Sequence, residues 1–422
     1  MATVSANSDP MVGHESCCLD DKMGMKIGIC GVGQFSPCFT RLFKAHPLVD
    51  EVVLADLIPE RARTEAARVG IKRVFASLDE LCRSDVDAIA IFTQRQLHGP
   101  HVLQALSAGK HVYCAVPMAM KVEEISQILE AIKRTGLLYM TGETSYYYPS
   151  TLYCRKRFQA GDFGRFAYAE AQYLHDMEHF YEPYRHSGGP DWKRVAGLPP
   201  MYYPTHSVSM VLSVTGARAT HVSCLGMHDR HEDGIFGAGR NHWDNPFSNE
   251  SALMRTSDGG VMRINEMRRV GWHGGNSVYM SFFGTDGSFE ENGVSSCWLT
   301  RNARDLKDVT KQVACGPSAE IDVQNAATPG ALRPEFFSSV SPAHPVGRLP
   351  ESFKGLPNGH YGSHQFLVDD FVTAWATRTL PPCHAWNAAR WDMPGLIAHE
   401  SALREGEMLP IPDFGDAPGS AR

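Results

Sequence analysis

Short apolar runs and helical patterns alternate along residues 25–142. The apolar runs lie at 26–30, 51–56, 86–92, 111–114 and 137–141. Helical periodicity separates them, as at 59–69 and 122–135. Short apolar runs bounded by turns are typical of buried strands, and their alternation with helices is typical of a parallel sheet covered on both faces. The pattern predicts an α/β fold that begins with a Rossmann doubly wound parallel sheet.

The pattern changes after Glu143. A helical stretch at 150–160 precedes a long alternating strand at 166–175. Two further segments, 251–268 and 278–290, each contain a glycine turn between alternating stretches, which is typical of β-hairpins. The sequence therefore predicts a second, α+β domain with a large, mostly antiparallel sheet.

Residues 315–362 contain seven prolines and several glycines, which predicts a long irregular loop. Because this loop lies inside the second domain, we expect it to be a cover or an oligomer contact. Leu367, Phe371 and Trp375 then recur at helical spacing and predict a closing helix.

These patterns divide the chain into a disordered tail at 1–23, a nucleotide-binding domain at 24–143 and a domain for substrate binding and oligomerisation at 144–422. The first 23 residues lack a basic stretch followed by an apolar one, so they do not resemble a secretory signal. The 11 cysteines are scattered without a C-x-x-C pair, which argues against a disulfide framework or a structural zinc site. We therefore expect a cytoplasmic protein.

The charge narrows the classes of partner. The net charge is −7 and the isoelectric point is about 6.2, which argues against a basic surface for nucleic acid or anionic lipid. No apolar run approaches the roughly 20 residues needed to span a bilayer. The 43% of hydrophobic and 21% of charged residues are ordinary for a globular protein, and we expect a small-molecule substrate.

A phosphate-binding motif follows the first expected strand. Gly31 and Gly33 begin a G-x-G-x-x-S sequence in which Ser36 takes the usual third small position. The first glycine permits a tight turn, and the second lets the backbone approach a pyrophosphate at a helix N-terminus. Gln34 and Phe35, between the second glycine and the helix, are further expected cofactor contacts.

Asp56 indicates which dinucleotide binds. It follows Gly33 by 23 residues at the end of the second expected strand, where an acid can bond the ribose diol. An acid there repels a 2′-phosphate, so the sequence favours NAD over NADP. Arg61 and Arg63 nearby keep NADP open. A simple strand–helix turn, with Asp56 as a helix cap, is the structural alternative.

Residues 108–117, Ala-Gly-Lys-His-Val-Tyr-Cys-Ala-Val-Pro, resemble the AGKHV-x-x-EKP signature of the Gfo/Idh/MocA family of NAD(P)-dependent sugar oxidoreductases. Residues 92–98 resemble the family's T-P-N-x-x-H segment: Thr93 and His98 match, while Gln94 and Arg95 replace Pro-Asn. The resemblance implies cofactor contacts at Thr93, His98, Val116 and Pro117. The family's lysine reaches the nicotinamide and the reacting hydroxyl, but Val116 stands in its place.

With valine at the lysine position, another group must accept the hydroxyl proton. The leading candidate is His206 in Tyr203-Pro204-Thr205-His206, because imidazole titrates near neutral pH. The wider family often has an Asp four residues before this histidine and another three after it, where this chain has Tyr202 and Ser209. A structural role is the alternative for a single histidine.

The combination of Tyr-Pro-Thr-His with Val-Pro resembles a branch of the family that contains NAD-dependent glycosidases of the α-N-acetylgalactosaminidase type. Residues 140–146 and 171–176 resemble two further segments of that branch. This resemblance implies that Glu143 and Tyr173 line the catalytic site beside His206. Alternatively, Glu143 caps the next helix and Tyr173 packs on its sheet face, which it shares with Ala167, Ala169 and Ala171 on a period of two.

In that branch the C3 hydroxyl is oxidised by NAD, the aglycone is eliminated after loss of the C2 proton, water adds and the hydride returns. The main prediction is an oxidoreductase that transfers a hydride between NAD and a ring-carbon hydroxyl, at C3, of a sugar or glycoside. A redox-neutral glycoside hydrolase is the close alternative. A non-catalytic NAD-binding sensor, favoured by Val116 alone, is the third.

Further polar residues are candidate substrate contacts. They are Tyr203, His175, Trp192 and Lys193, and from the long loop His360 and His364. The polar cluster at 228–233 has metal-binding residue types, but its spacing fits no specific site, so we expect no metal. The resemblance implies a homodimer or homotetramer.

Overall fold

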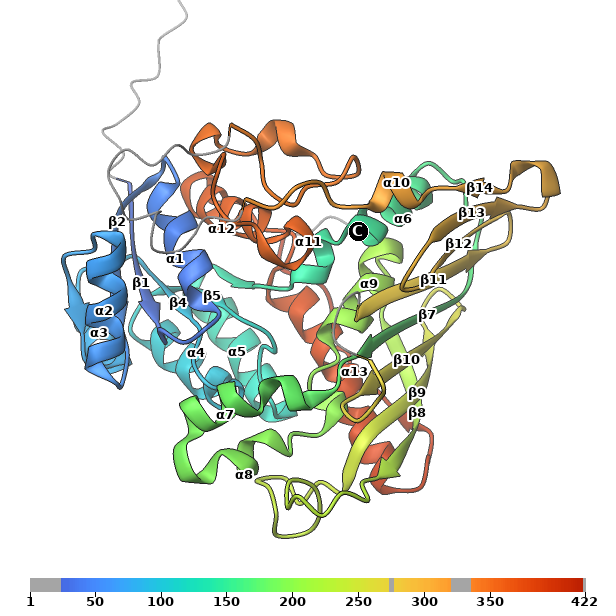
Figure 1. The fold of residues 1–422 in the computed structure, drawn as a ribbon, viewed down its shortest axis with the longest axis horizontal. Helices are drawn as coiled ribbons and strands as arrows, with labels where there is room; N and C mark the ends of the chain where they lie inside the picture. The colour runs from blue at the N-terminus through green and yellow to red at the C-terminus, as the bar shows by residue number, and fades with distance from the viewer. Residues whose placement is uncertain (1–23, 273–276, 320–334, 420–422) are drawn as a thin grey trace, which may run out of the picture.

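The computed structural model describes residues 24–272, 277–319 and 335–419 (Figure 1). The tail expected at 1–23 and the middle of the expected loop at 315–362 lie outside these ranges. Within them, no helix is long and apolar enough to cross a membrane.

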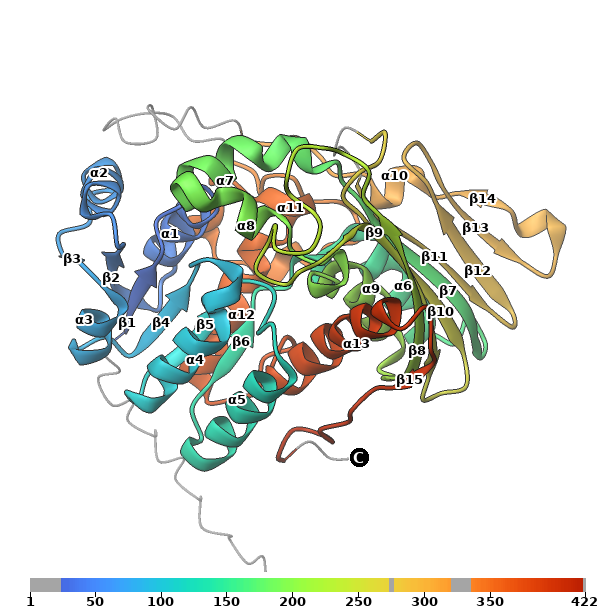
Figure 2. The same cartoon turned by 90° about the horizontal axis from the view of Figure 1, so that it is seen from below.

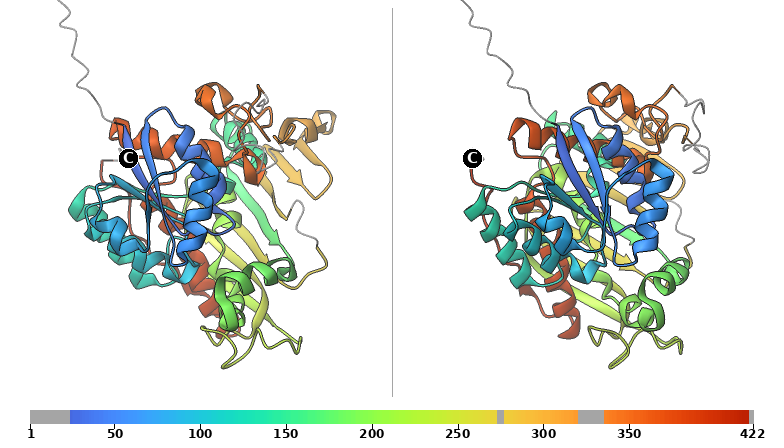
Figure 3. Two further views of the ribbon diagram at one scale, coloured as in Figure 1. Left: turned by 60° about the vertical axis from the view of Figure 1, so that its left-hand side comes forward. Right: turned by 90° about the vertical axis from the view of Figure 1, so that its left-hand side faces the viewer.

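The first sheet has six parallel strands in the described residues, in the order β3-β2-β1-β4-β5-β6. They are β1 (Met25–Cys30), β2 (Val49–Ala55), β3 (Val74–Phe75), β4 (Ala88–Ile91), β5 (His111–Cys114) and β6 (Tyr139–Thr141). The associated helices are α1 (Ser36–Ala45), α2 (Pro59–Val69), α3 (Leu78–Arg83), α4 (His98–Ser107) and α5 (Val122–Thr135). Figure 3 shows helices on both faces of this sheet. The predicted doubly wound parallel sheet is confirmed.

The strand order reverses between β1 and β4, which pair with each other in the middle of the first sheet. All four residues of β4 are buried, as expected for a central strand covered on both faces. In an open α/β sheet, ligands bind outside the carboxyl ends of the strands at such a switch point. The fold therefore predicts a ligand site beside Cys30 and Ile91.

The second sheet has nine strands among the described residues and is antiparallel except where β7 pairs with β10. Its strands are β7 (Phe166–Leu174), β8 (Ala219–His228), β9 (Phe247–Thr256), β10 (Val261–Met267), β11 (Val278–Gly284), β12 (Gly287–Glu291), β13 (Ser296–Thr300), β14 (Lys307–Asp308) and β15 (Leu409–Pro410). The expected hairpins are β9–β10 and β11–β12. The predicted mostly antiparallel sheet is confirmed.

Helices fill the space between the two sheets (Figure 2). The remaining helices are α6 (Pro149–Gln159), α7 (Tyr181–Gly188), α8 (Trp192–Ala196), α9 (Thr205–Thr215), α10 (Thr310–Val313), α11 (Gly359–Gly362), α12 (His364–Thr377) and α13 (Ala385–Leu403). Helix α9 packs on β7, while α13 packs on β8 and also reaches α5 and β6. Helix α13 therefore joins the two units.

Two sequence expectations need correction. The helix with Leu367, Phe371 and Trp375 does not close the chain: this helix, α12, packs on α1, with the Phe43 and Phe371 rings 6.3 Å apart, and α13 follows it. Ala167 does not share a face with Ala169 and Ala171. The pairing of β7 with β11 shifts register near residue 167, so Ala167 is exposed while the other two alanines are buried against α9.

The described parts of the 315–362 segment are largely irregular and contain the short helices η8 (Val346–Arg348) and η9 (Glu351–Phe353) and α11. The Phe353 ring lies 5.7 Å from that of His46, next to the end of α1. The segment therefore packs against the first unit rather than against the second sheet alone (Figure 1).

Candidate active site

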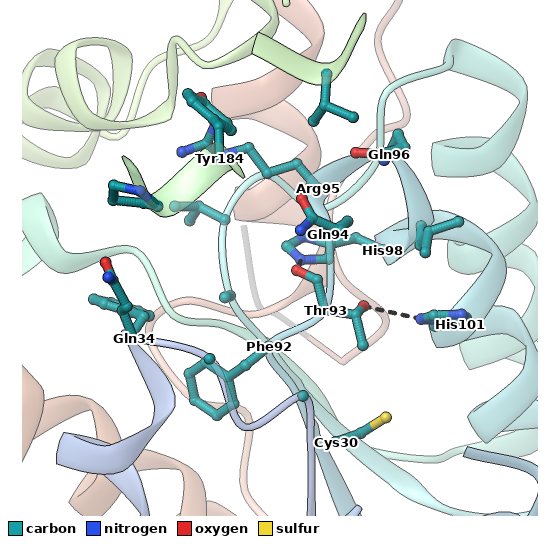
Figure 4. Close-up of a pocket in the computed structure, with 18 of the residues that line it drawn as sticks. Cys30, Gln34, Phe92, Thr93, Gln94, Arg95, Gln96, His98, His101 and Tyr184 are labelled. Carbon is teal, nitrogen blue, oxygen red and sulfur yellow. Dashed lines mark hydrogen bonds between the residues drawn. The ribbon is translucent and has the colours of Figure 1, made fainter. Parts of the chain in front are cut away.

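A cavity of about 640 Å³ lies between the two units. Its lining comes from the loops that follow β1, β4 and β5 and from α7 and the start of α9. A volume of this size suits a small-molecule or cofactor site. Figure 4 shows its wall around Phe92, Thr93 and Arg95.

The glycine motif forms one end of the cavity. Gly31 has φ +93°, and a Cβ there would lie 2.7 Å from the carbonyl oxygen of Phe92, so a side chain is excluded by the backbone. A Cβ at Gly33 would meet nothing within 4 Å and would occupy open space beside the helix. Helix α1 begins next to it, and the side chain of its N-cap residue, Phe35, makes no capping hydrogen bond. The loop thus leaves room and backbone donors for a pyrophosphate.

Asp56 connects the glycine loop to the start of α2. Its Oδ2 accepts a hydrogen bond from the Val32 N–H at 2.7 Å, and its Oδ1 accepts one from the Ile58 N–H at 2.8 Å. Each oxygen keeps a further lone pair, and the residue lines the cavity. Asp56 therefore has both the structural role left open by the sequence and the position needed to accept from a ribose diol.

The loop after β4 supplies Thr93, Gln94 and Arg95 to the cavity wall. The hydroxyl of Thr93 lies 2.9 Å from Nδ1 of His101, a bond drawn in Figure 4. Arg95 donates from Nη1 to the hydroxyl of Tyr184 at 2.7 Å. The sequence pattern marked Arg95 only as a departure from the family segment, because its contacts depend on α7, far along the chain.

His98 is almost fully buried beneath this loop. Its Nδ1 lies 2.7 Å from the carbonyl oxygen of Pro117, and its Nε2 lies 3.1 Å from that of Thr93. Burial lowers the pKa of His98 to about 4, so the ring is neutral at pH 7. Both ring nitrogens face protein carbonyls. His98 thus holds the loop after β4 against the Val116–Pro117 segment, in which Val116 lines the cavity and Pro117 does not.

Glu143 and His206 form a buried pair, and His206 lines the cavity. Nδ1 of His206 lies 2.6 Å from Oε1 of Glu143, although the two residues are 63 positions apart. Glu143 follows β6, and the same Oε1 accepts hydrogen bonds from the N–H and the hydroxyl of Ser145 at 2.9 and 2.8 Å. The capping role considered for Glu143 is therefore real, and contact with His206 accompanies it. His206 lies in the first turn of α9 and lines the cavity.

The electrostatics of this pair suit a base. Burial alone would raise the pKa of Glu143, but the adjacent imidazole outweighs that effect and holds the pKa below its usual range. An ionised Glu143 can accept a hydrogen bond from Nδ1–H of His206. In the tautomer that carries its proton on Nδ1, Nε2 keeps a lone pair that can accept a proton.

Two tyrosines stand next to His206 in the cavity lining. The ring of Tyr203 lies 5.3 Å from that of His206, and the ring of Tyr173 lies 5.7 Å away. Burial raises the pKa of both phenols, so they remain protonated at neutral pH. They can donate hydrogen bonds but cannot serve as anionic bases.

Three of the expected substrate contacts do not line the cavity. His175 lies beyond Tyr173, with its ring 4.6 Å from that of Phe180. Trp192 packs in a small separate core with Met177 and Ile235, and Lys193 donates to the carbonyl oxygen of Asp233. Helix α8 directs Trp192 and Lys193 away from the cavity, and the residue types alone could not indicate that direction.

In its described parts, the long loop contributes one side chain to the cavity, His360. Its backbone is left-handed, with φ 48°, an uncommon conformation for a residue with a side chain. Its Nδ1 lies 3.0 Å from Nε2 of His364, and its ring contacts Phe35 edge-on at 5.2 Å. The considered approach of His360 to the site is therefore observed, while His364 lies behind it.

The polar loop at 228–242 shows no metal-type arrangement. Across the three described ranges, no group of three or more His, Cys, Asp or Glu side chains is placed to hold a metal ion. His231 instead bonds Asp229 at 3.0 Å on the surface.

Residues 25–143 match the family model described as "Oxidoreductase family, NAD-binding Rossmann fold", GFO_IDH_MocA. This match covers the nucleotide-binding unit of the chain. The family model describes an NAD-binding Rossmann fold, and the geometry of the glycine loop, Asp56 and the cavity fits that cofactor.

Similarity to known proteins extends beyond residues 25–143. A glycosyl hydrolase family 109 protein of Streptomyces filamentosus is 24% identical over 414 residues, which cover 92% of this chain and 77% of that protein. A trans-1,2-dihydrobenzene-1,2-diol dehydrogenase of Bos taurus is 27% identical over 218 residues, covering 50% of this chain and 62% of that protein.

Solved structures of similar fold include levoglucosan dehydrogenase in complex with NADH and levoglucosan. It has a TM-score of 0.70 and 19% identity, and the match covers 93% of this chain and all of that one (100%). An oxidoreductase domain protein from Kribbella flavida has a TM-score of 0.69 and 18% identity over the same shares of the two chains, 93% and 100%. The likeness to these structures shows that their fold extends over nearly the whole chain.

Proposed function

We propose that this protein is an NAD-dependent enzyme that transfers a hydride between the cofactor and a ring-carbon hydroxyl, at C3, of a sugar or glycoside. One observation carries the proposal: the Glu143–His206 pair opens into the same cavity as the Gly31–Gly33 loop. A proton acceptor and a nucleotide site in one cavity are what alcohol oxidation requires. The similarity to dehydrogenases and glycosyl hydrolases supports the substrate class.

Each side chain has a distinct part in this proposal. When bound, NAD supplies the hydride acceptor. His206 takes the hydroxyl proton at Nε2 while Glu143 stabilises the resulting imidazolium through Nδ1–H. Tyr173 and Tyr203 donate hydrogen bonds that orient the hydroxyls of the sugar ring. Thr93, Gln34 and Phe35 border the cofactor, and Val116 presents an apolar surface where a lysine would compete for the proton.

The cofactor preference follows from the two arginines near Asp56. Arg61 donates to the carbonyl oxygen of His186 at 2.8 Å, and Arg63 lies on the surface beside Glu60. Neither is held towards the Asp56 carboxylate by a contact of its own, and the carboxylate repels a 2′-phosphate. We therefore propose NAD rather than NADP.

The assembly and location are part of the proposal. Residues 24–143 bind the nucleotide, and residues 144–422 bind substrate and self-associate in the cytoplasm. Leu225, Met227 and Leu253 expose 50% or more of their surface on β8 and β9. An apolar cluster on a sheet face supports a homodimer or homotetramer.

A redox-neutral glycoside hydrolase is the second candidate, favoured by Val116 and by the family 109 relatives. In that reaction the same Glu143–His206 pair would move protons, and the hydride taken from C3 would return after the aglycone leaves. No carboxylic acid pair flanking the glycosidic bond is then required.

The bound nucleotide is first identified after heat release from a separate sample of the purified protein. Two activity assays on the intact protein then decide between the candidates. Steady NADH formation from a free sugar supports the dehydrogenase. Cleavage of an aryl glycoside by the protein with its NAD tightly bound, and without net formation of NADH, supports the hydrolase. His206→Asn should abolish either activity, whereas His175→Asn, just outside the cavity, should retain most of it. If neither activity occurs and His206→Ala binds NAD normally, the protein is a sensor and the proposal fails.

A further inference from the structure

Arg95 presents a positive charge to the cavity at the end away from the glycine loop. It begins η1 (Arg95–Leu97), directly after the loop that follows β4. In Figure 4 it lies beside Tyr184, on the far side of Thr93 from Cys30. Tyr203, which contacts His206, is its other neighbour. The guanidinium therefore borders the space next to the proposed base.

This charge has no acidic counterpart among the residues that the structure describes: no carboxylate lies within 4.0 Å of the Arg95 guanidinium. Asp56 also lines the cavity, but it is bonded to the backbone at the glycine-loop end. Glu143 is bonded to His206. Arg95 is half-buried, and a guanidinium removed from water without an anion lowers stability. This favours an anionic ligand beside Arg95.

The position of the guanidinium is fixed. The Tyr184 hydroxyl accepts from Nη1 at 2.7 Å, and the guanidinium carbon lies 4.6 Å from the centre of the Tyr203 ring and 5.8 Å from that of Tyr184. Cation–π contacts on two rings hold the group without consuming its remaining donors. A guanidinium has five N–H donors in a planar fork, so several remain for a ligand.

The other titratable groups around the cavity leave this charge dominant. Burial lowers the pKa values of His98 and His360 to about 4, so both rings are neutral at pH 7. Burial also keeps the phenols of Tyr173 and Tyr203 protonated. Two other arginines lie nearby: Arg268 contacts the Tyr173 ring but pairs with Glu266, and Arg61 lines the cavity and donates to the His186 carbonyl oxygen. Arg95 is the arginine that contacts Tyr203, next to His206.

We propose that Arg95 binds a carboxylate of the substrate, so that the substrate is an acidic sugar or a glycoside bearing a carboxyl group. The inference rests on the proposed function. A planar carboxylate matches the guanidinium fork in shape and in its single charge. A phosphate dianion would need a second cation, and the other arginine that lines the cavity, Arg61, lies at the start of α2 and donates to the His186 carbonyl oxygen.

The test measures binding rather than turnover. NAD-loaded protein is titrated calorimetrically with matched pairs, glucuronate against glucose and galacturonate against galactose, with glucose 6-phosphate as a third arm. We expect an acidic sugar to bind about 10- to 100-fold more tightly than its neutral partner, the range of one charge-assisted hydrogen-bonded pair. The preference should decrease as salt is added.

The variants assign the preference to Arg95. Arg95→Gln should remove the preference for the acidic sugar while leaving NAD affinity unchanged, and Arg95→Lys should keep part of this preference. Tyr184→Phe removes one hydrogen bond to the guanidinium but leaves its charge, so it should weaken the preference less. Arg63→Gln is the control, because Arg63 is exposed outside the cavity.

Several results would overturn the assignment. Equal binding of acidic and neutral sugars, tighter binding of the phosphate, or loss of NAD affinity in Arg95→Gln would each contradict it. The NAD-induced rise in melting temperature shows whether each variant folds. If Arg95→Gln does not fold, the comparison of Tyr184→Phe with the wild type is the test. Tight binding of uronates without any hydride transfer or glycoside cleavage would leave Arg95 assigned and would disprove the proposed function.

Discussion

Gly31 and Gly33 stand two residues apart in the same motif, yet their surroundings differ. A Cβ at Gly31 meets backbone atoms of Phe92 and Thr93, just after β4, whereas one at Gly33 projects into open space. We predict that Gly31→Ala lowers the melting temperature of the protein without ligand, while Gly33→Val leaves it within a few degrees and removes most of the NAD-induced rise. Thermal melts with and without NAD measure both. Equal thermal shifts in Gly33→Val and wild type would rule out a pyrophosphate at this loop.

The Glu143 carboxylate fixes the tautomer of His206. We predict that Glu143→Gln lowers kcat by about 10²- to 10⁴-fold with a small change in KM, because a neutral amide no longer stabilises the imidazolium. Glu250 offers a matched comparison. Its Oε1 lies 2.7 Å from Nδ1 of His399 in an equally buried pair, and neither residue lines the cavity. Glu250→Gln should lower the melting temperature while changing kcat by less than about tenfold. Similar kcat losses in both variants would mean that the first pair is structural.

At the scale of elements, α2 and α7 meet across the mouth of the cavity. The contact is the hydrogen bond from Arg61 Nη2 to the carbonyl oxygen of His186, and both residues line the cavity. We predict that Arg61→Gln speeds NAD release about two- to tenfold, as expected for one exposed hydrogen bond. Arg63→Gln, two residues further along α2 and exposed, should leave the rate unchanged. Stopped-flow displacement of NAD measures the release rate. Equal rates in the two variants would show that the Arg61–His186 hydrogen bond does not retain NAD.

The elements of the first unit follow closely from local pattern. Helices α2 and α5 have the bounds expected from periodicity, because each has one apolar face, and each ends at a glycine with positive φ. Helix α13 was missed because it contains Pro394 and is buried on nearly all sides, which removes the amphipathic signal. The alanine face of β7 was misjudged at Ala167 for a related reason, since a register shift cannot be seen in a period of two.

At the scale of the whole molecule, buried neutral histidines make stability depend on pH. His384 caps α13, and burial lowers its pKa to about 4 from an ordinary value of 6.5. Its folded-state pKa is depressed, so its contribution is present above pH 6.5 and is lost as the pH falls towards 4. We predict that His384→Asn, which retains a capping acceptor, loses less stability over this interval, by on the order of 2 kcal/mol. Denaturant unfolding at several pH values measures it, and parallel pH profiles would contradict the assignment.

The candidate site could be predicted only in part, because it is assembled over long distances. The motif residues Gly31, Gly33 and Asp56 lie within one βαβ unit, where spacing and geometry are linked. The pairing of Glu143 with His206 joins two units of the chain, and resemblance rather than spacing indicated it. The environment of Arg95 depends on where α7 packs, and no local pattern specifies that.

The most direct test of the central claim is hydride transfer itself. Rapid mixing of NAD-loaded protein with sugars and glycosides, protonated or deuterated at C3, follows the absorbance of reduced nicotinamide in a single turnover. The account predicts formation of NADH, slowed by deuterium at C3 and abolished in His206→Asn, whether the signal persists or decays as the hydride returns. Substrate turnover with no reduced nicotinamide and no isotope effect at C3 would contradict it.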